Sequence, residues 1–313
     1  MSADESIGPT ALSLPIDGSF LVVDKPRGPS SHQVTAWVRD MLGVPRAGHA
    51  GTLDPSVSGI LVIAVGKALR LLPLLLDFPK RYVALIQLHG GVRSDDLARV
   101  LHEFQADIYQ IPPVRSAVRR ERRIRRIHKI RLIERDGNMA LVDVTCESGT
   151  YIRTLAVDVG DALGVGAHLA ELRRVASGPF SEKEAVTLST ISDAVATAVG
   201  GDNSALSTIL QPPSRVWKEV PTVVVKDTAV DAIAHGADLA AAGIMRVTGS
   251  FPKGAHVVAV TRNDELVAIG RSLVDSSTMT EEKKGWVVDT IKVFILPGQY
   301  PQTWGKRMHK DNE

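Results

Sequence analysis

The chain has 313 residues, a net charge of +2 and a single cysteine, Cys146. Its length allows two domains, each with its own core, and one cysteine excludes an internal disulfide and a cysteine-rich zinc site, which fits a reducing cytoplasm. The first twenty residues contain acidic residues and prolines without a long apolar run. We therefore expect neither a signal peptide nor a membrane span.

The N-terminal part of the chain predicts a strand followed by a helix. Phe20 to Asp24 is typical of a buried strand, and Ser30 or Ser31 can cap the helix after it. This helix ends at Gly43, and the run from Gly59 to Gly66 is continuously apolar, as in a central strand. The apolar positions at helical spacing are Val34, Trp37, Val38, Met41 and Leu42.

A glycine-punctuated loop, Gly48 to Pro55, separates that helix from the central strand. Glycine permits backbone angles that other residues resist, and Pro55 fixes the exit of the turn, so the loop can hold the Asp54 side chain rigidly toward a cleft. The alternative is a turn carboxylate that bonds its own backbone. Asp54 is therefore the first candidate catalytic residue.

The middle of the chain predicts an α+β fold. We expect the Asp54 loop and the helix that carries Arg153 to meet over one mixed, mainly antiparallel sheet flanked by helices. The predicted elements are strands at Tyr82 to His89, Arg125 to Glu134 and Met139 to Glu147, an amphipathic helix at Ser94 to Phe104, and a helix at Thr150 to Leu163.

Positive charge is concentrated between Arg115 and Arg131, where Glu121 is the only acidic residue. This asymmetry indicates a polyanionic partner more than the net charge does. Isoleucines recur within the run, so part of it must be a strand. We prefer a basic strand edge that follows a nucleic-acid backbone over a merely solvated run. The candidate RNA-binding arginines are Arg115, Arg119, Arg120, Arg122 and Arg123.

Pro212 and Pro213 mark a boundary, after which short strands with frequent glycine predict a small β-barrel. One helix, near Asp227 to His235, interrupts these strands. The expected domains are an N-terminal tail at 1–17, a catalytic domain at 18–213, a barrel at 214–300 and a C-terminal tail at 301–313. The barrel strands are expected at Val223 to Val225, His256 to Val260, Leu266 to Gly270 and Trp286 to Val288.

Five motifs of the chain resemble, in order, those of TruB-type pseudouridine synthases. Two further segments, Ile111 to Val118 and Leu163 to Arg174, are similar to the archaeal and eukaryotic H/ACA branch, the dyskerin-like enzymes. Ala234 to Leu239, with Gly270, resembles a PUA domain, an RNA-binding module, and the whole resemblance covers residues 18 to 300. The five motifs are Asp24 to Ser31, Gly48 to Pro55 with Gly59, Lys80 to Val83, Gly149 to Leu155, and Leu172 to Arg174 with Ser177 to Phe180.

The resemblance implies a reaction and a catalytic set. Conversion of uridine to pseudouridine breaks the C1′–N1 bond, turns the uracil and forms a C1′–C5 bond, so it implies no metal and no organic cofactor. Asp54 would act on the sugar as nucleophile or stabiliser, with attack on C1′, attack on C6 and removal of a sugar proton left open. Arg153 would pair with Asp54. Tyr82 would support the flipped base and help to remove the C5 proton, and His49 would fill the space the base leaves.

Each of these roles has a structural alternative. Arg153 could form a salt bridge with Asp158 or Asp161 on its own helix, Tyr82 could be a core residue, and His49 could hydrogen-bond within its loop. The residues that the resemblance gives a supporting role are Lys25, Pro26, Gly51 and Thr52, which would brace the Asp54 loop, and Leu172, Arg173 and Arg174, which would line the pocket or contact phosphate.

We therefore expect the catalytic subunit of an H/ACA guide-RNA ribonucleoprotein that acts with small partner proteins on rRNA, with tRNA as a further substrate, in an archaeal cytoplasm. One alternative is a guide-independent synthase for the tRNA T-arm. The other is a catalytically silent RNA-binding scaffold, against which the joint presence of Asp54, Tyr82 and Arg153 argues. Ala50, in place of an expected serine, and Ala176, in place of an expected arginine, depart from the family pattern.

Overall fold

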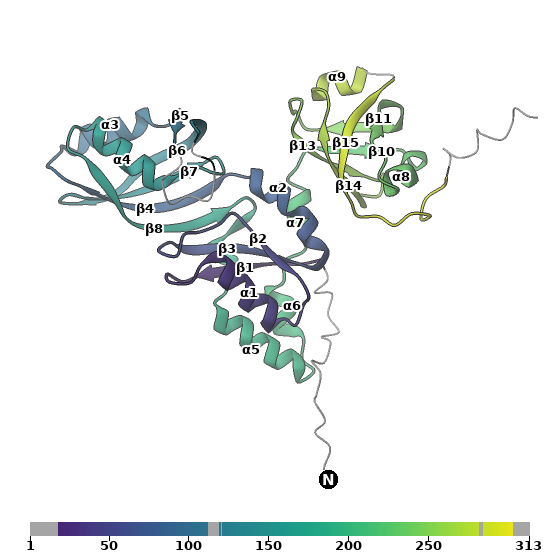
Figure 1. Ribbon diagram of the computed structural model, residues 1–313, viewed down its shortest axis with the longest axis horizontal. Helices are drawn as coiled ribbons and strands as arrows, with labels where there is room; N and C mark the ends of the chain where they lie inside the picture. Colours follow the sequence, from purple (N-terminus) through teal and green to yellow (C-terminus); the bar gives the residue numbers. More distant parts are fainter. Residues whose placement is uncertain (1–17, 112–118, 120, 282–283, 303–313) are drawn as a thin grey trace, which may run out of the picture. The chain divides into compact units, whose positions relative to one another are not determined.

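The computed structural model describes residues 18–111, 119, 121–281 and 284–302, and the chain divides after Pro213 into two compact units (Figure 1). Unit 1 is Met1–Pro213 and unit 2 is Ser214–Glu313. Within the described residues, no helix is both long enough and apolar enough to cross a membrane.

The described strands of unit 1 form one mixed sheet. Its order is β1-β3-β8-β4-β7-β6-β5, with β2 paired to β3 and β9 paired to β8. The pairings are antiparallel apart from a short parallel contact between β3 and β8. This confirms the expected α+β class with a mixed, mainly antiparallel sheet. The strands are β1 (Phe20–Lys25), β2 (Ala47–Ala50), β3 (Ser58–Val65), β4 (Lys80–Leu88), β5 (Asp107–Gln110), β6 (Arg123–Asp136), β7 (Met139–Cys146), β8 (Ala167–Ser177) and β9 (Phe180–Ser181).

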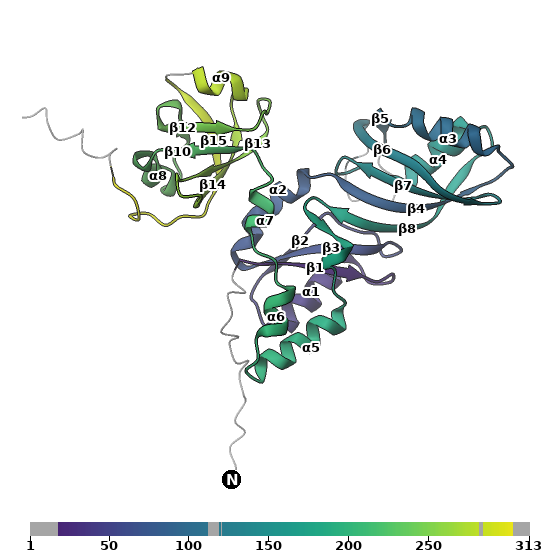
Figure 2. The same ribbon diagram turned by 180° about the vertical axis from the view of Figure 1, so that it is seen from behind.

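Two groups of helices cover different parts of this sheet (Figure 2). Helices α1, α5 and α6 pack on β1 and β3 around a core that includes Leu21, Val38 and Ile191. Helices α3 and α4 pack on β4, β6 and β7, where Ala84 and Leu155 are buried. The helices of unit 1 are α1 (Ser31–Met41), α2 (Leu72–Asp77), α3 (Ser94–Glu103), α4 (Ile152–Ala162), α5 (Leu188–Val199) and α6 (Ser204–Ile209), with 3₁₀ helices η1 (Gly66–Leu71) and η2 (Glu182–Glu184).

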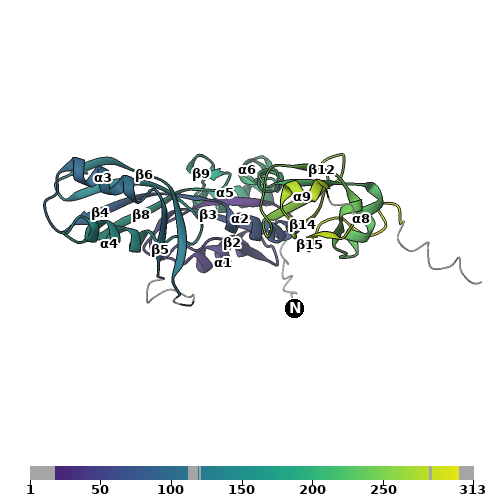
Figure 3. The ribbon, with the colours of Figure 1, turned by 90° about the horizontal axis from the view of Figure 1, so that it is seen from above.

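The strand β8 is the main element that the sequence pattern does not predict. It lies at the centre of the sheet between β3 and β4. Two register shifts interrupt its pairing with β4, so apolar and polar residues do not alternate regularly along it. The helix predicted from Thr150 begins at Ile152, because Tyr151 is its N-cap. Figure 3 shows β5 and β6 side by side, at the end of the sheet opposite β1.

Unit 2 is a small β-rich domain with its own core. Its described strands form a six-stranded sheet of order β11-β15-β14-β13-β10-β12, in which β10 and β13 are parallel. Val223, Val257 and Val287 are among its buried residues. The elements are α7 (Ser214–Trp217), β10 (Thr222–Val225), α8 (Asp227–Ala234), β11 (Leu239–Ala240), η3 (Ala241–Gly243), β12 (Ile244–Thr248), β13 (His256–Val260), β14 (Leu266–Ser272), α9 (Ser276–Glu281) and β15 (Trp286–Val293).

Candidate active site

The loop that carries Asp54 is fastened on both sides of that residue. The Ser31 hydroxyl donates to the Leu53 carbonyl at 2.9 Å and accepts from the Leu53 amide at 2.8 Å. The Gly28 amide donates to the Pro55 carbonyl at 2.8 Å. The backbone of Asp54 is thereby fixed, while 54% of its side chain is exposed.

The two serines that precede α1 divide the roles that the sequence left open. The Ser30 hydroxyl accepts from the Gln33 amide and caps the helix. Ser31 is buried and binds the Asp54 loop instead. Sequence reasoning missed this function, since a serine at a helix start is ordinarily assigned to capping.

Arg153 is directed at Asp54. Its Nη2 donates to Asp54 Oδ2, and about half of each side chain is exposed, at 47% and 54%. This pairing excludes the alternative salt bridge to Asp158 or Asp161 in this structure. The pKa of the Asp158 carboxyl is raised by burial and by the neighbouring Asp161, as expected of a group that no cation neutralises.

The start of α4, and with it Arg153, is positioned by Gln110 of β5. The Gln110 side chain is buried; its amide donates to the Tyr151 carbonyl at 3.1 Å and its oxygen accepts from the Tyr151 amide at 2.9 Å. This two-bond clamp ties the helix N-cap to the edge of the sheet. Gln110 carries no motif signal, so sequence reasoning does not find it.

Tyr82 lies on the face of β4 that α4 covers, and its partly buried ring packs against the core beneath that helix. Burial raises the pKa of its hydroxyl, Arg174 opposes that rise, and Asp54 adds to it. The Tyr82 hydroxyl therefore lies near both the Arg174 guanidinium and the Asp54 carboxylate. The structure thus brings together Asp54, Tyr82 and Arg153, from a loop, a strand and a helix.

His49 of β2 is held as a neutral imidazole. The Thr35 hydroxyl donates to the Ser31 carbonyl at 2.8 Å, so it accepts from His49 Nδ1 at 2.9 Å. His49 Nε2 then faces the Thr52 hydroxyl at 3.4 Å. Burial, followed by the neighbouring His32 and Arg174, lowers the pKa of His49 to about 4.

Three cations are buried below the Asp54 loop. Arg174 donates to the carbonyls of Ile60 at 2.8 Å and Gly51 at 3.0 Å. Lys25 donates to the Pro26 carbonyl at 2.7 Å, and its pKa is lowered by burial, then by Arg174. These contacts place Lys25, Pro26 and Gly51 around the loop, where bracing residues are expected.

The third buried cation, Lys80, is a residue that sequence reasoning left without a role. Its ammonium donates to the carbonyls of Leu75 at 2.7 Å and Phe78 at 2.6 Å, at the end of α2. Burial, followed by Arg174, lowers the pKa of Lys80 to about 8. Its position at the head of the Lys80 to Val83 motif is the signal that could have found it.

Arg173 and Arg174 point to opposite sides of β8. Arg173 makes a bidentate ion pair with Asp24, at 3.0 and 3.1 Å, and a second pair with Glu182 at 2.5 Å. Arg174 is 1% exposed, so of the two expectations for this residue, pocket lining and phosphate contact, the structure supports the first. Leu172 packs on the same core cluster as Tyr82.

The basic hairpin between β5 and β6 is partly neutralised. Arg119 pairs with Glu121 at 2.9 Å, and the Arg122 guanidinium lies 5.4 Å from the Tyr109 ring centroid. Arg123 begins β6. Of the other expected RNA contacts, Arg115 and Arg120 lie outside the described residues.

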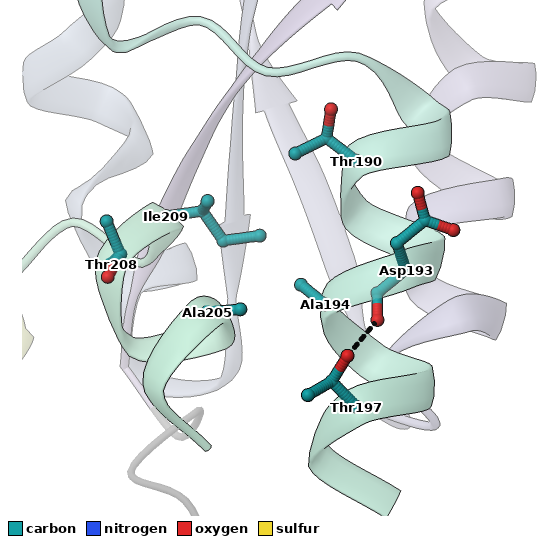
Figure 4. Close-up of a pocket in the computed structure, with 7 residues that line it drawn as sticks. All are labelled: Thr190, Asp193, Ala194, Thr197, Ala205, Thr208 and Ile209. Atoms are coloured by element: carbon teal, nitrogen blue, oxygen red, sulfur yellow. Dashed lines mark hydrogen bonds between the residues drawn. The ribbon is translucent and has the colours of Figure 1, made fainter. Parts of the chain in front are cut away.

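A hollow lies between α5 and α6, outside the catalytic constellation (Figure 4). It has a volume of about 390 Å³ and is lined by threonines, alanines, Ile209 and Asp193. The Thr197 hydroxyl donates to the Asp193 carbonyl at 2.9 Å within α5. None of the residues that surround Asp54 contributes to it.

Three family models match the chain in succession. Residues 39–152 match the N-terminal domain of the TruB family of pseudouridylate synthases. Residues 153–216 match the C-terminal domain of tRNA pseudouridylate synthase B, and residues 221–294 match the PUA domain.

Curated relatives are similar over nearly the whole chain. A probable tRNA pseudouridine synthase B of Pyrobaculum arsenaticum is 48% identical over 92% of this chain and 87% of its own length. A protein of the same description from Methanothermobacter thermautotrophicus is 46% identical over 90% of this chain and 87% of its own length.

Solved structures agree with these relatives. A chain in the crystal structure of a Cbf5-Nop10-Gar1 complex superimposes with a TM-score of 0.87 and 41% identity, covering 96% of this chain and 94% of that one. A chain in the structure of an H/ACA RNP bound to a substrate RNA containing 2′-deoxyuridine gives a TM-score of 0.80 and 41% identity, covering 91% and 88%. The chain therefore belongs to the TruB family, and it is a pseudouridine synthase with a C-terminal PUA domain.

Proposed function

We propose that this chain is the catalytic subunit of an H/ACA guide-RNA ribonucleoprotein and that it converts specific uridines of rRNA, and of tRNA, to pseudouridine. The observation that carries the proposal is an exposed carboxylate, Asp54, paired with Arg153 beside Tyr82, in a chain that matches subunits of H/ACA complexes at both of its units. We propose the guide RNA, the RNA substrate and small H/ACA proteins as its partners. An archaeal, cytoplasmic setting belongs to the same proposal.

Asp54 is the group that we assign to the sugar of the target uridine. Its backbone is fixed by Ser31 and Gly28 while the carboxylate is open to solvent, so a flipped nucleotide can approach it without rearrangement of the loop. The Arg153 guanidinium holds the carboxylate as a charge-assisted pair and directs one oxygen. The other oxygen remains available for the reacting atom.

Tyr82 is the group that we assign to the base. Its ring is only partly buried, so we propose that it offers a surface for a uracil that has lost its neighbours in the RNA stack. During the reaction the C1′–N1 bond breaks, the uracil turns, C5 bonds to C1′, and the C5 proton leaves while N1 gains one. We assign the Tyr82 hydroxyl to that exchange. No net redox change accompanies these steps.

A guide-independent tRNA synthase is the second candidate, and the description of the relatives as probable tRNA pseudouridine synthases favours it. The catalytic assignments are the same for both. They differ in how the target uridine reaches Asp54, through base pairing with a guide or through the folded shape of the tRNA. A silent RNA-binding scaffold has no use for the Asp54–Arg153 pair.

The test is a reconstitution with purified chain, the small H/ACA proteins and one target RNA. Pseudouridine is mapped with a guide RNA that matches the target, with a guide of scrambled pairing sequence, and without a guide. We expect modification with the matched guide alone. Equal modification of a tRNA T-arm in all three mixtures, with none of the guided target, would select the second candidate.

A further inference from the structure

A bulge in β8 decides which arginine faces the active site. Arg81 of β4 pairs with Ala176, but the next residue, Tyr82, pairs with Arg174, so Val175 has no partner. Residues that pair directly in an antiparallel ladder lie on the same face of the sheet. In a regular ladder Arg174 would oppose Val83 on the far face, and the bulge instead sets it beside Tyr82.

Two glycines, Gly59 and Gly51, lie close to Arg174. A Cβ at Gly59 would lie 2.2 Å from the Arg174 carbonyl oxygen, which no side chain tolerates. A Cβ at Gly51 would lie 3.3 Å from Arg174 Nη1, in the loop that carries Asp54. Gly59 thus leaves room for the backbone of β8 at position 174, and Gly51 leaves room for the Arg174 guanidinium. Glycine is therefore required at both positions by close packing as well as by the positive φ angle.

The guanidinium joins three segments of the site. From β8 it donates to Ile60 of β3 and to Gly51 of the Asp54 loop, and it lies across the ladder from Tyr82 of β4. Its acceptors are backbone carbonyls, and among the described residues no carboxylate forms an ion pair with it. A buried cation without a counter-charge lowers the stability of the folded chain, so the presence of Arg174 here calls for a functional explanation.

We propose that Arg174 is a positioning residue of the reaction, which fixes the Tyr82 ring relative to the Asp54 loop by binding both from within the sheet. The proposal rests on the role proposed for Tyr82. Arg174 does not contact RNA, and it acts through the two residues that do. Burial raises the pKa of the Tyr82 hydroxyl, and the charge of Arg174 and its hydrogen bond to that hydroxyl oppose this rise.

The first experiment measures the Tyr82 hydroxyl directly. Position 82 is labelled with 3-fluorotyrosine, and its ¹⁹F chemical shift is titrated with pH in the otherwise unchanged chain and in Arg174→Met. Loss of a cation next to the phenol is expected to raise the titration midpoint by about one unit. Arg81→Met is the matched control, because Arg81 adjoins Tyr82 in sequence but pairs with Asp143 on the other face. Its midpoint should be unchanged.

The second experiment measures the reaction. At saturating RNA, the single-turnover rate of Arg174→Met should fall by roughly one to two orders of magnitude, since misplaced groups lose rate rather than affinity. The RNA dissociation constant should stay within about twofold, because a buried residue makes no phosphate contact. Arg174→Lys keeps the charge without the planar fork, so it should restore the midpoint but only part of the rate.

An unchanged midpoint in a folded Arg174→Met protein overturns the proposal, and so does an unchanged rate. Unfolding gives a different signature, because the midpoint then falls to the ordinary value of the label instead of rising. In that case Arg174→Lys decides, and a wild-type rate in this variant overturns the proposal. Full activity of Tyr82→Phe would instead remove the role proposed for Tyr82, even if the midpoint still depends on Arg174.

Discussion

At the scale of single residues, the groups that fix the Asp54 backbone are different from the carboxylate that we assign to the reaction. The loop backbone is held by bonds to Leu53 and Pro55, the neighbours of Asp54, so its conformation does not depend on the half-exposed carboxylate alone. A residue of this kind can be replaced without loss of fold. The catalytic assignment can therefore be tested without the uncertainty that a destabilised variant brings.

Asp54→Asn should abolish pseudouridine formation and leave RNA affinity within a few-fold, because the amide keeps the shape and loses the charge. Product is measured by pseudouridine mapping and affinity by filter binding, with mass spectrometry to exclude deamidation back to aspartate. Asp40→Asn is a suitable control, since Asp40 pairs with Arg39 on the surface of α1. Substantial turnover by a verified Asp54→Asn protein contradicts the assignment.

His49 should make the stability of unit 1 depend on pH. The pKa is about 4 in the folded chain, against an ordinary value of 6.5, so below pH 6.5 the unfolded chain gains a proton that the folded chain refuses. The contribution of His49 is complete above pH 6.5 and is lost between 6.5 and about 4. The gap in Tm between wild type and His49→Gln should therefore narrow as the pH falls through that range.

His128→Gln, at an exposed position of β6, is the control for His49→Gln. Its Tm is measured against wild type over the same pH range. A gap for His49→Gln that is constant from pH 7.5 to 4.5 would show that folding does not lower the pKa of His49.

The sequence predicts the candidate catalytic residues better than the residues that support them. Asp54, Tyr82 and Arg153 lie in recognisable motifs, and the structure brings them together. Gln110 and Ser31 act through hydrogen bonds to backbone groups distant in sequence, which no local pattern records. The alternative salt bridge of Arg153 could not be excluded from spacing, because a helix offers the same neighbours wherever it packs.

At the scale of elements, the close approach of β3 to β8 requires a glycine at position 59. Gly59 has φ +102° and stands opposite Arg174, in the parallel pairing that joins the two parts of the sheet. The same strand, β3, pairs with β1 along its other edge and with β2 further along the edge that contacts β8. A displacement at Gly59 would therefore be felt on both sides of the Asp54 loop.

Gly59→Ala should destabilise unit 1 more than Gly137→Ala. Both glycines have positive φ, at +102° and +54°, and alanine at such a position costs about 1–2 kcal/mol. Only Gly59 adds a steric clash, worth roughly 1–3 kcal/mol more, since nothing lies within 4 Å of a Cβ at Gly137. Thermal unfolding of the two variants measures the difference, and equal losses would mean that the backbone angle alone requires glycine.

The basic hairpin should contribute to RNA binding through phosphate contacts. Replacing Arg119, Arg120, Arg122 and Arg123 by glutamine should flatten the slope of log affinity against log salt by roughly three, at about 0.7–0.9 per contact. The pairing of Arg119 with Glu121 makes it the weakest contributor. Arg93→Gln with Arg99→Gln on α3 is the control, and an unchanged slope in the hairpin variant would contradict a phosphate-binding role.

Element boundaries show where sequence patterns stop. Helix α3 follows its amphipathic pattern, with Leu97, Val100 and Leu101 buried. The sequence does not predict β8 because its two bulges break the two-residue period on which strand prediction depends. The information that defines β8 lies in its partners, β3 and β4, and not in its own residues.

At the scale of the whole molecule, each unit has its own sheet and its own core. The composition shift after Pro213 indicates this division from the sequence. A module with an independent core can bind RNA without taking part in the reaction. The C-terminal unit is therefore the natural candidate for an anchor of the guide RNA.

A chain that ends at Pro213 should lose guide-RNA binding and guided rRNA modification, while activity on a tRNA T-arm persists in part, because that substrate has a folded shape of its own. Gel-shift assays and pseudouridine mapping measure these outcomes, with circular dichroism to establish that unit 1 is folded. If the folded, truncated chain modifies guided targets as well as the full chain does, unit 2 is not the anchor.

The bulge at Val175 makes the surroundings of Arg174 depend on strand register as well as on sequence. A pairing of β8 with β4 that left no residue without a partner would shift β8 by one position on one side of Val175 and exchange its two faces there. Arg173 would then face inward and Arg174 outward. Deletion of Val175 itself would leave Arg174 opposite Tyr82, so the position of this arginine depends on the register of β8 and not on the number of residues in the strand.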